Sequence, residues 1–275
     1  MNSSRFGVYL GLRPHGEEQV LGDRILVASD DSEEGRYATE VASRLRGEHA
    51  APLAILRVDQ FAPSAAPGGS SPGALAGWLE RQPRSATSWI AQGVPGIEIS
   101  RFGDRHRASL IVLGRRDRAG RQPASLGETA DAVVRRAGIP VLSVPKGSWP
   151  FRRGLVALDE TPRSHQVLDL ALRWSREIDL PLVGVTVTQN GAGATRRSVA
   201  VAASAAGMAG TPPAIQVSLR TGSPAVEILE EVCAAEAGVL VIGYRRGGPP
   251  KVVEPTETAR SLLLAAPCAV LTVPL

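Results

Sequence analysis

The sequence predicts an α/β protein made of two tandem, doubly wound domains. Segments recur along the chain at a constant offset, and within each copy short β-branched runs alternate with stretches of helical periodicity. Alternation of this kind is typical of parallel sheets whose strands are joined by crossover helices. The length of 275 residues, with 43% hydrophobic and 21% charged residues, suits two soluble domains.

The repeat has one offset of 129 residues, which separates Asp30 from Asp159. The paired segments are LVASDDS (26–32) with LVALDET (155–161), GVPGIEI (93–99) with GSPAVEI (222–228), LIVLG (110–114) with VLVIG (239–243), and VLSVP (141–145) with VLTVP (270–274). A shared offset over four landmarks indicates a tandem duplication, and duplication fixes the architecture before any motif is considered. We therefore predict domains over 24–147 and 148–275, preceded by an arm over 1–23 that has no counterpart in the repeat.

Each copy is expected to contain five strands. In the first copy these are 25–29, 53–58, 87–91, 109–113 and 141–144, and their counterparts in the second copy include 182–187, 215–219 and 270–273. The buried fourth strand of each copy ends in glycine and leads through a glycine-containing turn into a helix. The linker over 146–153 is short, which favours direct packing of one copy on the other. We expect the final strands of the two copies to pair, because an unpaired apolar strand edge would promote aggregation.

Helices are expected between the strands. Ala38, Val41, Ala42 and Leu45 fall on one helical face after the first strand, with Ser32 as the N-cap. In the second copy, Thr161 followed by proline gives the cap and first-turn proline of the same helix. Other helices are expected at 74–81, after the proline of each G-x-P segment, and after each glycine turn.

The composition argues against several classes of protein. The apolar runs are too short or too interrupted for a signal or membrane segment, so a cytoplasmic protein is expected. Cys233 and Cys268 form no CxxC pair, and neither metal-ligand spacing nor a Ser/His/Asp set is present. The net charge of +4 comes with dispersed arginine pairs and only 4% aromatic residues, which disfavours nucleic-acid binding.

An aspartate after the first strand, the segment G-x-P-x-x-E-I and a buried strand ending in glycine occur in this order in both copies. This arrangement resembles the universal stress protein family from about residue 24 to 275. The resemblance implies five parallel strands per domain in the order 3-2-1-4-5, with the tandem copies packed as an internal pseudo-dimer. In members that bind ATP, that aspartate and a valine ending the second strand contact the nucleoside, and G-x-x-G-x9-G-[ST] wraps the phosphates.

The family's site is carried over residue by residue, with departures in both copies. The first copy retains Asp30, Val58, Gly114 and Gly127, but has Asp117 at the second glycine, Glu128 at the hydroxyl position and Thr129 one residue late. The second copy retains Asp159, Val187 and Gly243, but has Arg246 at the second glycine, Thr256 at the third and Glu257 at the hydroxyl position. The second copy is therefore expected to have the more degraded nucleotide site, because it departs from the family's motif at more positions.

Glu128 and Glu257 fall in the first turn of a helix, where a carboxylate is stabilising by itself. The protein can thus fill its own anion site, and Asp30 can likewise cap its own turn. A carboxylate about 4 Å from a phosphoryl oxygen costs on the order of 4 kcal/mol at an effective dielectric near 20. Micromolar binding amounts to only about 8 kcal/mol. One such repulsion would therefore remove about half of the binding free energy. The repulsion could be offset by nearby cations, either Mg²⁺ held by Asp117 or the side chains of Arg115, Arg116, Arg118 and Arg121.

Three functions follow as hypotheses. We favour a non-catalytic stress-response or signalling protein whose adenine-nucleotide pocket is doubtful in the first copy and degraded in the second, with ATP or AMP and Mg²⁺ as the candidate ligands of the first copy. The alternative is a universal stress protein that binds, or slowly hydrolyses, ATP in the first copy. In a third, purely structural scaffold, Arg115 and Glu128 fill a vestigial pocket. Protein partners and the association of two chains stay open.

Overall fold

The computed structural model describes residues 24–46, 51–60, 72–116, 127–159, 161, 163–188, 215–244 and 256–275. The expectations for the arm over 1–23, for Asp117 and for Arg246 lie outside the described residues, as do those for Arg118 and Arg121. The predicted domain boundaries stay predictions.

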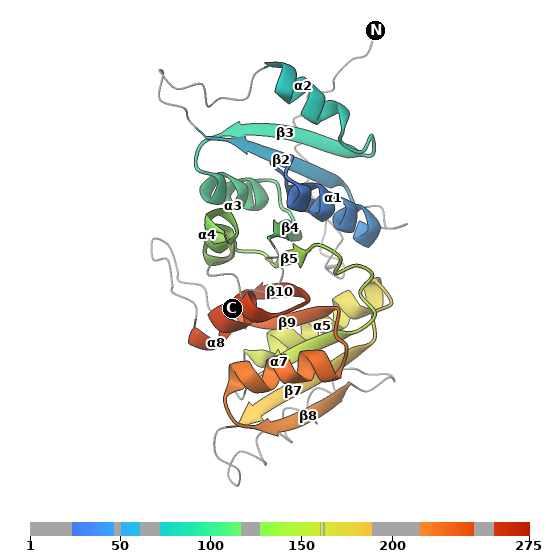
Figure 1. The fold of residues 1–275 in the computed structure, drawn as a ribbon, viewed down its shortest axis with the longest axis vertical. Coiled ribbons are helices and arrows are strands. Elements are labelled where there is room, and N and C mark those ends of the chain that lie inside the picture. The colour runs from blue at the N-terminus through green and yellow to red at the C-terminus, as the bar shows by residue number, and fades with distance from the viewer. Residues whose placement is uncertain are drawn as a thin grey trace, which may run out of the picture.

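Within the described residues, ten strands form one sheet, in the order β3-β2-β1-β4-β5-β10-β9-β6-β7-β8 (Figure 1). Their bounds are β1 (Ile25–Ala28), β2 (Leu53–Asp59), β3 (Ala86–Gln92), β4 (Leu110–Arg115), β5 (Val141–Pro145), β6 (Gly154–Leu158), β7 (Leu182–Thr188), β8 (Gln216–Thr221), β9 (Val239–Tyr244) and β10 (Ala269–Pro274). Each half of the sheet has the order third, second, first, fourth, fifth, which confirms the order predicted for each copy. Strands pair in parallel within a half.

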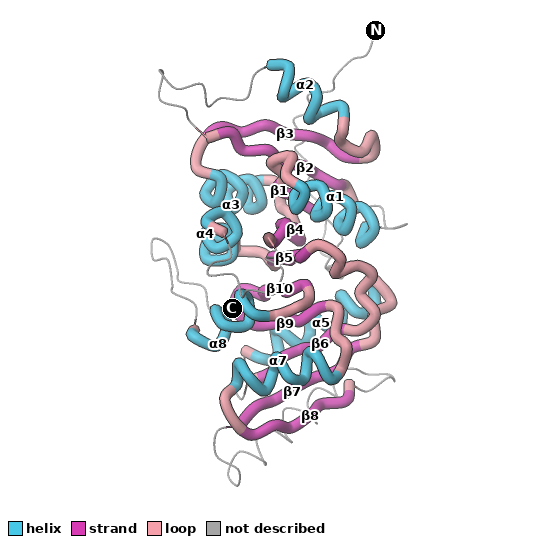
Figure 2. The backbone as a smooth tube through the Cα atoms, in the orientation of Figure 1, coloured by secondary structure: helices cyan, strands magenta, loops and turns pink. Residues whose placement is uncertain are grey.

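Helices cover both faces of this sheet, as the helical and strand segments of Figure 2 show. The described helices are α1 (Glu33–Arg46), α2 (Pro72–Glu80), α3 (Pro95–Arg105), α4 (Glu128–Arg136), α5 (Ser164–Glu177), α7 (Pro224–Ala234) and α8 (Glu257–Ala265). Ile25 and Val27 of β1 belong to the buried cluster that contains the apolar faces of α1 and α5. Leu26, one residue along, belongs to the cluster on the opposite face with α3, α4, α7 and α8. The central strands are buried on both faces, which explains their continuous apolar runs.

The two halves meet where β5 and β10 pair antiparallel, with Leu271 opposite Leu142. The Thr272 hydroxyl adds a buried hydrogen bond across this junction, donated to the carbonyl of Val141 at 3.1 Å. The prediction that the final strands pair is therefore confirmed. The linker also packs on the first half, since the Trp149 N–H donates to the Tyr37 hydroxyl at 2.8 Å. Pairing of the two terminal edges removes the exposed edge that each half would have alone.

The helix that follows the first strand begins differently in the two halves. Ser32 caps α1 as predicted, because its Oγ accepts the Gly35 N–H at 3.1 Å. The corresponding prediction for Thr161 is wrong: α5 begins only at Ser164, with Arg163 at the N-cap. The Thr161 hydroxyl is instead donated to a carboxylate oxygen of Asp159 at 2.6 Å, so it is engaged before the helix starts.

Candidate functional site

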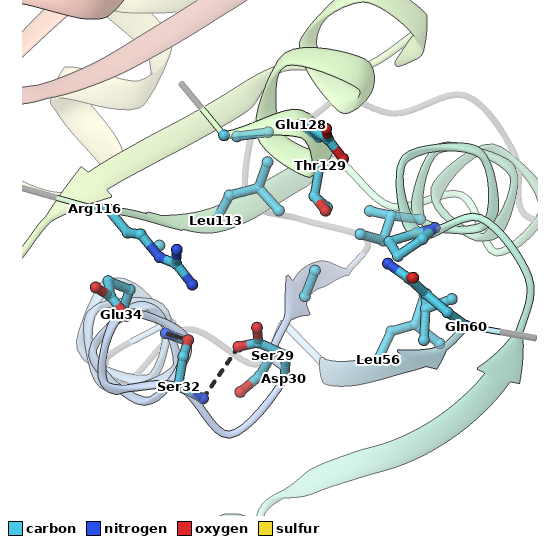
Figure 3. Close-up of a pocket in the computed structure, with 18 residues that line it drawn as sticks. Ser29, Asp30, Ser32, Glu34, Leu56, Gln60, Leu113, Arg116, Glu128 and Thr129 are labelled. Atoms are coloured by element: carbon cyan, nitrogen blue, oxygen red, sulfur yellow. Dashed lines mark hydrogen bonds between the residues drawn. The ribbon is translucent and has the colours of Figure 1, made fainter. Parts of the chain in front are cut away.

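A cavity of about 600 Å³ lies in the first half, where β1, β2 and β4 end and α1 and α4 begin (Figure 3). Parallel strands gather their carboxyl ends at one edge of a sheet, and open α/β sheets form ligand crevices there. Six of the seven candidate residues predicted for this half line the cavity: Asp30, Val58, Gly114, Gly127, Glu128 and Thr129. The seventh, Asp117, lies outside the described residues.

Asp30 follows β1 in a tight turn that its own side chain stabilises. Its Oδ1 accepts the Ser32 N–H at 3.1 Å, and Asp31 between them has a positive φ of 70°. Among the described residues this is the one hydrogen bond that the Asp30 carboxylate accepts. Figure 3 shows that carboxylate facing the cavity. Asp31 turns elsewhere and pairs with Arg81. The turn thus holds the Asp30 carboxylate at the cavity, and this carboxylate can still accept further hydrogen bonds.

Gly114 permits a close approach of α1 to the end of β4. A Cβ atom at this position would lie 2.3 Å from the carbonyl oxygen of Glu34 and 2.4 Å from its carbonyl carbon. Both are backbone atoms of α1, so no side-chain rotation relieves the contact. The glycine predicted as part of a phosphate-binding motif is therefore required here by packing of a helix that itself walls the cavity.

The first turn of α4 forms the opposite wall. Gly127 is its N-cap, with φ 86° and ψ 139°, and a Cβ there would meet nothing within 4 Å. Its glycine requirement is thus one of backbone conformation. Glu128 is the first helical residue, as predicted, where the helix dipole favours a carboxylate. In Figure 3 the Thr129 hydroxyl points into the cavity, opposite Asp30.

Comparison with known proteins agrees with this fold. Residues 22–145 match the model of the universal stress protein family. By this match, the first half of the chain is similar to the universal stress protein family. A universal stress protein of Methanocaldococcus jannaschii is 33% identical over 75 residues, which cover 25% of this chain and 44% of that relative. The match thus spans less than half of the relative's length.

Two solved structures share the fold over more than nine tenths of the chain. A universal stress protein from Archaeoglobus fulgidus superposes with a TM-score of 0.73 and 17% identity, over 92% of this chain and 98% of that one. A Pseudomonas aeruginosa protein named as a universal stress protein gives 0.71 and 19%, over 94% and 95%. The tandem arrangement of strands is therefore shared beyond the half that the family model covers.

The second half of the chain keeps the residues that correspond to those of the first-half site, but engages them differently. Asp159 follows β6, Val187 is in β7, Gly243 is in β9, and Thr256 and Glu257 begin α8. The Asp159 Oδ1 accepts three hydrogen bonds, from the Thr161 N–H at 3.0 Å, the Thr161 hydroxyl at 2.6 Å and the Ser164 hydroxyl at 2.6 Å. Its own chain thus supplies the donors that a ligand would bring.

The position of Ser164 accounts for much of the difference in hydrogen bonding between Asp159 and Asp30. Ser164 lies 129 residues after Gly35, so the hydroxyl that binds Asp159 has no equivalent beside Asp30. Apolar side chains also crowd the second half's glycine: a Cβ at Gly243 would lie 2.8 Å from Leu275 Cδ1 and 2.9 Å from Val167 Cγ2. The Thr256 hydroxyl is engaged as the N-cap of α8, where it accepts the Ala259 N–H.

Sequence reasoning misplaced one arginine and missed several lining residues. Arg115, expected in the phosphate turn, is 4% exposed and donates to backbone carbonyls of the second half. Alternation along β4 places it on the face of Leu113, and this signal was present in the sequence. The neighbouring Arg116 does line the cavity. The missed residues include Ser29, Ser32, Glu34, Gly35, Leu56 and Gln60.

The described residues hold no group of three or more His, Cys, Asp or Glu side chains that could ligate a metal ion. None of the helices in the described part of the chain combines the length and apolarity that crossing a membrane requires.

Proposed function

We propose that this protein is a non-catalytic signalling module of the universal stress type that binds one adenine nucleotide per chain, in the first half. The observation that carries the proposal is the open cavity whose wall brings together Asp30, Val58 and the first turn of α4. A pocket filled by the protein's own side chains would have favoured the scaffold hypothesis. Arg115, which would fill the pocket under the scaffold hypothesis, instead binds carbonyls of the second half.

The chemistry of the wall suits a nucleoside. A cavity of about 600 Å³ falls within the range of small-molecule sites, which combine apolar walls with a few convergent polar groups. Leu56, Val58 and Ile99 supply apolar surface for a planar base. Asp30 and the Gln60 amide face the same space, and they offer acceptors and donors for ring nitrogens or ribose hydroxyls (Figure 3).

The charges favour a ligand with few phosphates. Asp30, Glu34 and Glu128 line the cavity beside one described cation, Arg116. A phosphate approaching the α4 N-terminus meets the helix dipole and free N–H groups, but also the Glu128 carboxylate. We therefore propose that AMP binds at least as well as ATP, and that ATP binds as its Mg²⁺ complex, because the cation offsets repulsion by the carboxylates.

The second half is proposed to hold no nucleotide. The Asp159 Oδ1 already accepts the Thr161 and Ser164 hydroxyls, and Leu275 lies against Gly243. Hydrogen bonds to a charged group contribute about 1.5–3 kcal/mol each, so a ligand that had to replace those at Oδ1 would lose much of a micromolar binding free energy.

Titration calorimetry with AMP and with Mg-ATP tests the proposal on the full chain. We expect one site per chain in the wild type, loss of binding in Asp30→Ala and unchanged binding in Asp159→Ala, which is the matched control in the second half. Glu128→Ser should strengthen Mg-ATP binding more than AMP binding. Two sites per chain, or binding that is insensitive to Asp30→Ala, would contradict the proposal.

The alternative of slow ATP hydrolysis is separated by turnover. The described cavity is lined by the carboxylates Asp30, Glu34 and Glu128, any of which could orient a water, so only a rate measurement separates the two hypotheses. Continuous phosphate release at saturating Mg-ATP should equal the protein-free rate. Sustained release that Asp30→Ala abolishes would establish the hydrolytic alternative.

A further inference from the structure

The side chain of Arg115 crosses from the first half of the sheet into the second. Its guanidinium donates to the carbonyls of Leu263, Ala266 and Cys268 at 3.2, 2.6 and 3.0 Å, and the side chain is buried. Leu263 lies in the last turn of α8, and Ala266 is its C-cap. These are the carbonyls that a helix leaves without intrahelical donors, at the end where the macrodipole favours a cation. These hydrogen bonds therefore give the buried guanidinium its acceptors and give the carbonyls at the end of α8 their donors.

Arg115 also belongs to the cavity by chain position. It is flanked by Gly114 and Arg116, and both line the cavity. Its backbone is the last residue of β4, in register with Pro145 of β5. The strand thus ends at the residue whose side chain is held by α8. Movement of α8 relative to the first half would pull directly on the wall that carries Gly114 and Arg116.

The corresponding position of the second half carries a different side chain. The residue 129 positions after Arg115 is Tyr244, which is buried in β9 and has a phenol in place of a charged guanidinium. The half whose aspartate is engaged therefore receives the Arg115 side chain, and the half with the open cavity supplies it. Through Arg115, the second half has a role that does not need a ligand of its own.

We infer that Arg115 is a positioning residue that couples the first-half cavity to the C-terminus of α8, so that the second half holds in place the wall that carries Gly114 and Arg116. The inference rests on the proposed function for its ligand. Because coupling of two sites is reciprocal, nucleotide binding should also stabilise the end of α8.

The test compares wild type with Arg115→Met, Arg115→Lys and Thr272→Val. Thr272→Val is the matched control, because it removes a buried hydrogen bond across the same junction without touching the turn at Gly114. Affinity for AMP and Mg-ATP is measured by calorimetry on folded protein, and backbone exchange by hydrogen–deuterium mass spectrometry. We expect Arg115→Met to weaken binding by about fivefold or more, Arg115→Lys by less, and Thr272→Val not at all.

Exchange gives a readout that a merely structural contact would not move. Nucleotide should slow exchange in the last turn of α8 in wild type and Thr272→Val, but not in Arg115→Met. Without nucleotide, exchange over 110–116 should be faster in Arg115→Met than in Thr272→Val.

If wild type binds neither nucleotide, the proposed function fails while this ligand-free comparison still decides the inference. Equal effects of Arg115→Met and Thr272→Val, or none from either, would overturn it. If Arg115→Met does not fold, Arg115→Lys against Thr272→Val decides.

Discussion

Substitution of Gly114 by alanine should destabilise the protein strongly. The new Cβ would lie 2.3 Å from the Glu34 carbonyl oxygen, whereas ordinary contact begins near 3.4 Å, so α1 must retreat by about 1 Å. That helix is packed through fully buried residues such as Val41 and Ala42, and it cannot move without disturbing them. Overpacking typically costs about 1–3 kcal/mol, and contact with backbone argues for the upper end. We expect a loss of about 3 kcal/mol, or about 6–10 °C in Tm.

The control for this prediction is Gly147→Ala. Gly147 also has a positive φ, 79°, but a Cβ there would meet nothing within 4 Å, so the expected cost is only the conformational one of about 1 kcal/mol. Urea unfolding followed by circular dichroism measures both free energies of unfolding. Because α1 walls the cavity, Gly114→Ala should also weaken nucleotide binding. A loss no larger than that of Gly147→Ala would refute the packing argument.

Three further predictions test other parts of the structure. Gly35→Ser should weaken AMP binding about tenfold in calorimetry, because a hydroxyl beside Asp30 would imitate the Ser164 contact; unchanged affinity would contradict this. Burial, and to a smaller extent the charges of Arg24 and Arg105, lower the pKa of His106, so the folded protein binds this proton less readily than the unfolded chain does. Stability should therefore fall as the pH drops below the ordinary pKa of 6.5. The Tm of His106→Phe, measured over the same pH range, should fall less than that of the wild type. Burial raises the pKa of Cys268 to about 11, so a thiol reagent at pH 8 should label only the exposed Cys233 until the chain unfolds.

Much of the fold was predictable because its signals are local and repeated. The offset of 129 residues, the buried runs that became β4 and β9, and the apolar face of α1 each report backbone structure through periodicity. Ser32 was predictable as a cap for the same reason, since its partner lies three residues away. The corresponding prediction failed at Thr161, because the hydroxyl competes for Asp159 and the helix begins later.

The candidate site was predictable in part. Asp30 and Gly114 could be placed from chain order, since parallel strands bring their carboxyl ends to one edge, whereas Glu128 was assigned through the resemblance to the universal stress protein family. The reason for Gly114 could not, because the atom that demands a glycine belongs to the Glu34 backbone, 80 residues earlier in the chain. The engagement of Asp159 likewise depends on how its turn folds, and similar sequences in the two halves have different hydrogen bonds.

The sequence by itself determined the duplicated architecture, the strand-and-helix order and the identity of the residues at the edge of the sheet. Only the tertiary structure decided which aspartate remains available and where Arg115 points. Periodic apolar patterns encode which backbone is buried, because burial follows from each residue's own chemistry. A hydrogen bond or a steric contact between distant segments depends on their relative placement, and the contacts of Arg115 join residues about 150 positions apart.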